Sequence, residues 1–151
     1  MRIYIESTMP SYLVARPARD LLQAARQQMT KDWWDLKSGQ HELFTSQIVL
    51  DEIAEGERAM ANRRLKIMSG VPVLELTAGA ADLTRRILDS GLVPAKADAD
   101  AAHIALATVH QMDILLTWNS GTSPMLPSKP GSVGWSRQMA LNCHPFARWT
   151  N

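Results

Sequence analysis

The chain has 151 residues, 46% of them hydrophobic and 21% charged, a composition typical of one soluble globular domain. Its single cysteine, Cys143, excludes an internal disulfide framework, and no apolar run approaches the length of a membrane span. The apolar stretch at the N-terminus is too short for a secretion signal. We therefore expect a cytoplasmic protein without a membrane partner.

The formal net charge of +1 conceals an asymmetry between the body and the tail of the chain. Residues 1–119 carry 13 Lys and Arg against 15 Asp and Glu, whereas residues 120–151 carry three basic residues and no acid. A protein that binds nucleic acid through a broad basic face would have a more positive body. Any contact with a polynucleotide must therefore be local or assisted by a metal ion.

Strand-like and helix-like segments alternate from the N-terminus onward. A short apolar strand is predicted at residues 3–5, followed by a helix with Pro10 in its first turn. Residues 17–37 predict a long amphipathic helix, and a second strand at residues 42–45 precedes a helix capped by Ser46. The expected inner face of the long helix consists of apolar residues at three- and four-residue steps: Leu21, Leu22, Ala25, Met29, Trp33 and Leu36.

The same alternation continues to residue 116. A helix is expected from Gly56 to Met68, a strand at residues 71–76, and a helix that is capped by Thr77 and ends at Gly91. Pro94 begins an alanine-rich helix that runs to about residue 109, and a fourth strand follows at residues 114–116. Strands separated by helices favour an α/β fold in which helices cover both faces of a parallel sheet.

Three acidic residues occupy positions suited to a shared site. Glu6 follows the first strand, Glu52 lies on the apolar seam of the helix after the second, and Asp100 lies on the helix before the fourth. Ligands of parallel sheets gather beyond the carboxyl ends of the strands. Mg²⁺ prefers oxygen ligands and needs only one or two direct carboxylates. The acids therefore predict a magnesium site that serves chemistry on phosphate.

Other residues near these acids have weaker claims to a role. His103 shares a helix face with Asp100, and packing beside the site is favoured for it over a role in orienting substrate. Asn119 either supports the metal site or ends the fourth strand. Arg16 and Arg19 follow the first acid closely and are candidates for contact with the backbone of a polynucleotide.

Four segments in order resemble the PIN domain family, in particular the bacterial VapC-like branch of toxins. They are YIESTMPSYL at residues 4–13, SQIVLDEI at 46–53, DAAHIALA at 100–107 and LLTWN at 115–119. The resemblance covers residues 1–119 and implies an α/β/α sandwich with the activity of a Mg²⁺- or Mn²⁺-dependent endoribonuclease. It also implies a homodimer and an antitoxin partner.

The resemblance assigns roles to particular residues. Glu6, Glu52 and Asp100 take the places of the family's metal-binding acids, although most members have Asp in the first place. Ser7 and Thr8 keep the hydroxyls that follow the first acid and could orient it. The implied reaction is metal-assisted hydrolysis, in which the ion activates water and offsets charge on the phosphate.

The tail departs from the family pattern after Asn119. Plausible codons for the family's Arg-His-Ile-Ala-Asn-Ala, CGG CAC ATC GCC AAT GCT, encode Gly-Thr-Ser-Pro-Met-Leu when read from the second nucleotide. That is the sequence at residues 121–126. We infer a one-base frameshift near codon 120, so that residues 120–151 form an irregular tail without the family's last helix and edge strand.

Two further interpretations compete with the nuclease. The altered tail predicts, as an alternative, an inactive remnant that binds only a metal ion or a partner. A nucleotide-binding Rossmann domain is disfavoured because the first strand leads into Glu6-Ser7-Thr8 and lacks a glycine-rich phosphate turn.

Overall fold

One sheet organises the chain, with the strands in the order β3-β2-β1-β4-β5. The computed structural model describes residues 1–94, 96–119 and 140–142. The first four strands in this order pair in parallel, and β5 pairs antiparallel with β4. The strands are β1 (Arg2–Ile5), β2 (Glu42–Ser46), β3 (Val73–Leu74), β4 (Ile114–Leu116) and β5 (Ala140–Asn142).

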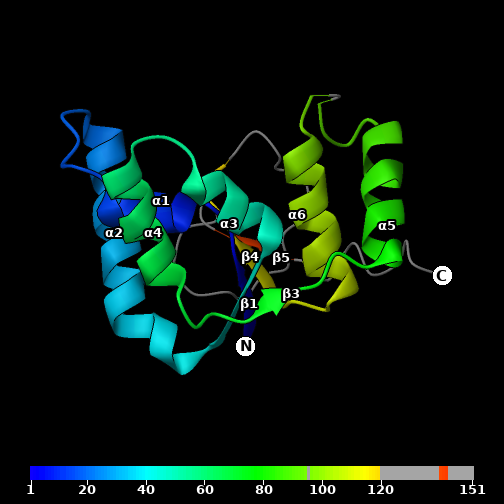
Figure 1. Cartoon of the computed structure of the whole chain (residues 1–151), viewed down its shortest axis with the longest axis horizontal. Helices are drawn as coiled ribbons and strands as arrows, with labels where there is room; N and C mark the ends of the chain where they lie inside the picture. The colour runs from blue at the N-terminus through cyan, green and yellow to red at the C-terminus, as the bar shows by residue number, and fades with distance from the viewer. Residues whose placement is uncertain (95, 120–139, 143–151) are drawn as a thin grey trace, which may run out of the picture.

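Helices cover both faces of this sheet. Figure 1 shows α1, α2 and α4 grouped on one side of the strands and α5 and α6 on the other, which is the expected α/β/α sandwich around a parallel sheet. The helices are α1 (Thr8–Val14), α2 (Leu21–Lys37), α3 (Gln47–Ala54), α4 (Arg58–Met68), α5 (Ala78–Asp89) and α6 (Asp98–Val109), with a short 3-10 turn η1 (Ser38–Gln40).

The central strand β1 explains why the sheet needs helices on both sides. Ile3, Tyr4 and Ile5 are all buried, although successive side chains of a strand point to opposite faces. A continuous apolar run of this kind is typical of a parallel strand that is covered on both faces. Its register places Tyr4 beside Phe44 of β2 and Leu115 of β4.

Side-chain caps fix where several helices begin. Asp20, Ser46 and Thr77 each accept a hydrogen bond from a backbone N–H of the first turn of α2, α3 and α5. The caps at Ser46 and Thr77 were predicted. The long helix begins at Leu21, later than predicted, because Asp20 provides its cap. The alanine-rich helix begins at Asp98, and the third strand is only two residues long.

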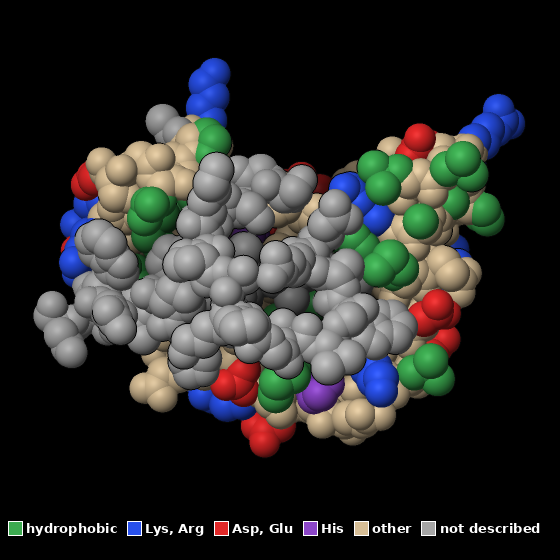
Figure 2. All heavy atoms as spheres, turned by 180° about the vertical axis from the view of Figure 1, so that it is seen from behind, with side chains coloured by type: hydrophobic (Ala, Val, Ile, Leu, Met, Phe, Trp, Pro, Cys, Tyr) green, Lys and Arg blue, Asp and Glu red, His purple; other side chains and the backbone are tan. Residues whose placement is uncertain are grey.

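The predicted inner face of α2 is wrong in part. Trp33 is buried and Met29 is partly buried, as predicted, but Leu21, Leu22 and Leu36 are 87%, 56% and 65% exposed. Gln27 and Thr30 are buried in their place. Polar residues are buried here because they have partners. The Thr30 hydroxyl accepts a hydrogen bond from Trp118 Nε1 at 2.7 Å, and Gln27 donates to Arg16 O and accepts from Ala18 N. Figure 2 shows hydrophobic side chains gathered on the surface of the side that α1, α2 and α4 form.

The expected absence of an edge strand after β4 is also corrected. Ala140–Asn142 pairs antiparallel with β4, with Leu115 opposite Leu141. The free backbone groups of an edge strand can pair with any extended segment, so this pairing needs no hydrophobic period in the sequence. Residues 120–139 and 143–151, where the rest of the predicted tail falls, lie outside the described residues.

Within the described part of the chain, no helix combines the length and the hydropathy that crossing a bilayer requires.

Candidate metal centre

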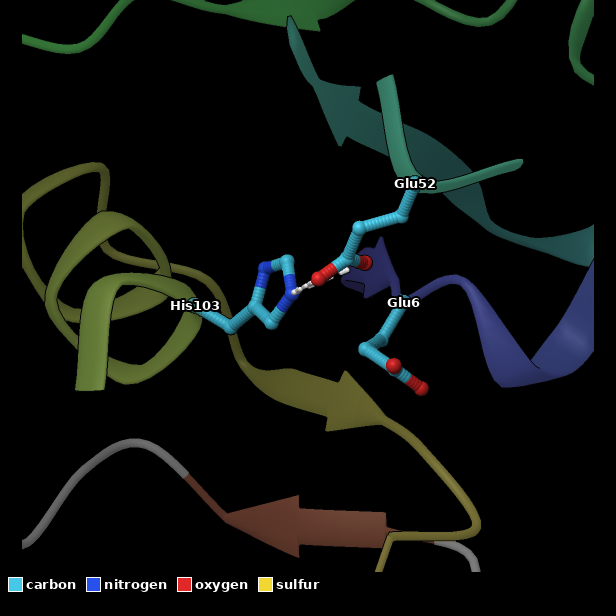
Figure 3. Close-up of side chains that lie close together, drawn as sticks. All are labelled: Glu6, Glu52 and His103. Carbon is cyan, nitrogen blue, oxygen red and sulfur yellow. Dashed lines mark hydrogen bonds and ion pairs between the residues drawn. The ribbon is translucent and has the colours of Figure 1, made fainter. Parts of the chain in front are cut away.

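Three side chains from separate elements meet at the carboxyl end of the sheet. Glu6 directly follows β1, Glu52 lies on α3, and His103 lies on α6. Each offers one ligand atom, and these atoms all lie within 4.8 Å of one another. Figure 3 shows the edge of the His103 imidazole directed at the carboxylate of Glu52, with the Glu6 side chain beside them. This group could hold a metal ion.

Glu6 is held in place by hydroxyl groups. It is 5% exposed, and its Oε1 accepts a hydrogen bond from Ser7 Oγ at 2.8 Å. Its Oε2 accepts from Thr8 N, Thr8 Oγ1 and Thr117 Oγ1 at 3.0, 2.5 and 2.9 Å. The expected contact of Ser7 and Thr8 with the first acid is therefore present. Thr117, which follows β4, was not singled out in the sequence. The neighbouring strand end supplies it because β4 pairs with β1.

His103 connects Glu52 to the core of the sheet. Its Nε2 lies 3.4 Å from Oε1 and 3.3 Å from Oε2 of Glu52, and its Nδ1 lies 2.9 Å from the Tyr4 hydroxyl. That hydroxyl also lies 2.6 Å from Ser46 Oγ. His103 thus belongs to the group itself, whereas the sequence favoured packing beside the site, and it bonds to side chains of β1 and α3. Nothing in the sequence singled out Tyr4 for this contact.

Burial and neighbouring groups shift the pKa values of two carboxyl groups at the site in opposite directions. Burial alone would raise the pKa of Glu52, but His103, through its hydrogen bond and charge, and the Ser7 hydroxyl hold that pKa below its usual value. Burial raises the pKa of Asp100. The charges of Glu6 and Glu52 add to this rise, and His103 and Asn119 oppose it. The pKa of Asp100 therefore depends on all three members of the group.

Asp100 nevertheless does not belong to the group of closest ligand atoms. It stands in the first turn of α6, one turn before His103, and its Oδ1 accepts a hydrogen bond of 2.8 Å from Asn119 Nδ2. Asn119 follows β4 and so links the third acid to the sheet. The sequence expected three acids at equal standing, whereas the structure places Glu6 and Glu52 with His103 and leaves Asp100 at the rim.

The expected contact of basic residues with a polynucleotide backbone stays a prediction. Arg16 and Arg19 are exposed in the connection between α1 and α2. Arg26 of α2 was not considered, yet its guanidinium carbon lies 5.4 Å from the centre of the Trp118 ring. Trp118 N donates to Thr8 Oγ1, which itself donates to Glu6. The buried Nε of Arg26 makes no hydrogen bond within the described residues.

The arrangement fits a divalent cation on two observations. Oε2 of Glu52 is buried and makes no hydrogen bond among the described residues, although His103 Nε2 lies 3.3 Å away, and a cation would complete the surroundings of this anionic oxygen. Glu6, Glu52 and Asp100 also gather negative charge at one place, and the charges of Glu6 and Glu52 add to the rise that burial causes in the pKa of Asp100. A bound cation would contact Glu52 Oε2 and would offset the gathered negative charge.

No protein-family model matches this chain, and comparison with curated proteins and with solved structures finds no significant match. The functional interpretation therefore depends on the four motifs, the fold and the geometry of this site.

Proposed function

We propose that the protein is a Mg²⁺- or Mn²⁺-dependent endoribonuclease of the PIN type. The observation that carries the proposal is the meeting of Glu6 and Glu52 at the carboxyl end of the sheet, with Asp100 electrostatically coupled to both. Oxygen donors of this kind suit a hard divalent cation, and the α/β/α fold places them where parallel sheets bind ligands. The motif resemblance supplies the substrate class, RNA.

The chain's own residues divide the work of holding such an ion. Glu6 is fixed by four hydrogen bonds and offers an anion whose position is set before any ligand arrives. Glu52 offers its Oε2, which makes no hydrogen bond among the described residues, and Asp100 adds a third carboxylate from the rim. A divalent cation bound there makes water more acidic and offsets negative charge on a phosphodiester.

Contact with the RNA backbone belongs to the same proposal. Arg26 is better placed for it than the exposed Arg16 and Arg19, because its guanidinium lies over Trp118 and Trp118 contacts Thr8 beside the first acid. A guanidinium fork matches the geometry of a phosphate. Loss of Arg26 should weaken RNA binding and reduce its salt dependence. Filter binding of Arg26→Ala and Arg19→Ala at several salt concentrations compares the two, and equal effects would argue against Arg26.

The decisive experiment measures RNA cleavage by the purified chain with Mg²⁺, with Mn²⁺ and with EDTA. We expect cleavage only with the metal ions and a loss of at least about 10²-fold in Glu6→Gln and Asp100→Asn, because the carboxylates hold the cation. Asp98→Asn is the matched control, since Asp98 is an exposed acid in the same turn of α6. A folded wild-type chain that binds metal but cleaves no RNA would support the inactive remnant.

The partners implied by the motif resemblance, an antitoxin and a second copy of the chain, are part of this proposal. Light scattering of the purified chain measures whether two copies associate. A mass equal to one chain at micromolar concentration would contradict the expected homodimer.

A further inference from the structure

The hydrogen-bond chain behind Glu52 runs through three elements and returns to the helix where it began. Ser46 caps α3 by accepting a hydrogen bond from Val49 N at 3.4 Å, and its Oγ lies 2.6 Å from the Tyr4 hydroxyl of β1. Tyr4 reaches His103 of α6, and His103 reaches Glu52 of α3. The position of Glu52 is therefore tied to the cap of its own helix through the sheet and the opposite layer.

For a neutral His103, the direction in which the Tyr4 hydroxyl donates decides which ring nitrogen carries the proton. Tyr4 is fully buried, and its phenol hydroxyl has one proton to donate. When the Ser46 hydroxyl donates to Tyr4, the Tyr4 proton points at His103 Nδ1. Nδ1 then accepts, and the ring proton of the neutral imidazole lies on Nε2.

A proton on Nε2 matches what that nitrogen faces. Nε2 stands 3.4 and 3.3 Å from the two carboxylate oxygens of Glu52. The other neutral tautomer would direct a lone pair at an anion, which is unfavourable. The side chain of Glu52 is 32% exposed and that of His103 only 3%, so the imidazole is the fixed member of the pair and the carboxylate the one that needs fixing.

We propose that Tyr4 and His103 are positioning residues, which hold the Glu52 carboxylate in the orientation in which it meets the ion, and that His103 is not itself a metal ligand. This inference rests on the proposed function. Mg²⁺ selects oxygen over imidazole nitrogen, which agrees with a histidine placed behind a carboxylate. Partners of ligating groups commonly change metal affinity by about 10- to 100-fold when they are removed.

The hydrogen-bond chain is tested first in the metal-free protein. Long-range ¹H–¹⁵N correlation spectra of ¹⁵N-histidine-labelled protein at mildly alkaline pH report which ring nitrogen is protonated. We expect the Nε2–H tautomer at His103 and a change in its nitrogen shifts in Tyr4→Phe. A proton on Nδ1 with a bare Nε2 would overturn the proposal, because His103 could then neither donate to Glu52 nor orient it.

Metal affinity is measured next, by electron paramagnetic resonance of Mn²⁺ titrated into the full chain. We expect Tyr4→Phe and His103→Ala to weaken binding by about 10- to 100-fold. His103→Gln should recover part of the loss, since its amide can donate to Glu52. Tyr12→Phe and His110→Gln are controls: Tyr12 lies against Trp118, and His110 binds Glu75 O at the end of α6. Controls that lose as much affinity as the test variants overturn the proposal.

Spin-echo modulation from ¹⁴N in the Mn²⁺-loaded wild-type chain that disappears in His103→Gln would make His103 a ligand and also overturn the proposal. If Tyr4→Phe fails to fold, His103→Gln and His103→Ala still decide the matter. None of these measurements uses RNA, so a chain that binds Mn²⁺ without cleaving RNA ends the nuclease proposal alone. A chain that binds no Mn²⁺ ends both.

Discussion

Helices α2 and α6 bury opposite kinds of residue, and the difference shows what decides burial in this fold. In α6 every residue from Ala101 to Thr108 is buried, and α5 packs against this helix on the side away from the sheet (Figure 1). In α2, Gln27, Thr30 and Trp33 are the buried residues, and several leucines face outward. A helix covered on two sides buries its whole circumference, whereas a helix at the rim buries the stripe for which partners exist.

The two helices also carry their polar groups differently. The polar residues that α6 buries include His103, which connects to Glu52 and Tyr4. The buried polar residues of α2 form hydrogen bonds to Trp118 and to the backbone of the connection before the helix, and so they support packing. Small alanines let α6 approach its neighbours closely, so its first two turns can present Asp100 and His103 to the site. Four pairs of variants test these differences in burial and bonding, from the largest effect to the smallest.

Trp33→Ala and Leu36→Ala compare the two faces of α2. Trp33 is 7% exposed and Leu36 is 65% exposed. We expect Trp33→Ala to lower the free energy of unfolding by about 3–5 kcal/mol, through lost burial and the cavity left behind. Leu36→Ala should change it by no more than about 0.5 kcal/mol. Urea denaturation measures both. A large loss in Leu36→Ala would show that the outward stripe of α2 is covered in solution.

Ala105→Leu and Ala25→Leu compare added volume on the two helices. Ala105 is fully buried in α6, and an inserted isobutyl group must displace its neighbours, at about 1–3 kcal/mol or more. Ala25 is exposed on α2, so the same change there should be close to neutral. Thermal unfolding followed by circular dichroism distinguishes them. Equal midpoints for the two variants would mean that α6 has room beside it.

Sequence patterns predicted most of the fold because most of its signals are local. The apolar runs at residues 3–5 and 114–116 and the caps at Ser46 and Thr77 each need only a few neighbouring residues to be recognised. The prediction of the buried face of α2 failed in part, because Thr30 is buried against Trp118, which is 88 residues away in the chain. A helical period shows which residues share a face, but not which face finds partners.

The acids of the site and the hydroxyls beside Glu6 were predicted, but the contacts of His103 were not. Glu6 and Glu52 could be placed because carboxyl ends of parallel strands meet at one edge of the sheet. The contact of Tyr4 with His103 depends on how β1, α3 and α6 pack together, and no local pattern encodes that. For the same reason the sequence could not show that His103 lies nearer to Glu6 and Glu52 than Asp100 does.

Thr30→Val and Thr84→Val compare a long-range hydroxyl with a local one. Thr30 Oγ1 accepts from the buried Trp118 Nε1, whereas Thr84 Oγ1 donates to Ala80 O within α5. Thr30→Val leaves the indole N–H without a partner, so we expect a loss of about 1–3 kcal/mol in the free energy of unfolding. Thr84→Val removes only a bond to a carbonyl that the helix already satisfies and should cost less. Urea denaturation would contradict this ranking if Thr84→Val were the more damaging change.

Asp100→Asn and Asp35→Asn compare an acid at the site with an exposed acid of α2. Burial together with Glu6 and Glu52 raises the pKa of Asp100 in the folded chain. The contribution of this group to the free energy of unfolding is therefore fully present below its unfolded pKa. It is lost as the pH rises through the raised folded pKa. At neutral pH without metal, Asp100→Asn should then raise the melting temperature slightly, by no more than about 3 °C.

The rise in melting temperature of Asp100→Asn should vanish in acid, where the wild-type carboxyl is protonated. Asp35→Asn, at an exposed acid of α2, is the control for the loss of one negative charge. Adding Mg²⁺ should reverse the order, since an ion that binds the folded wild-type chain more tightly than the variant stabilises the wild type more. Melting curves with EDTA and with Mg²⁺ measure both effects. If Asp100→Asn is less stable than wild type in EDTA, the crowding of negative charge at the carboxyl end of the sheet does not oppose folding, and one of the two reasons for expecting a cation there is lost.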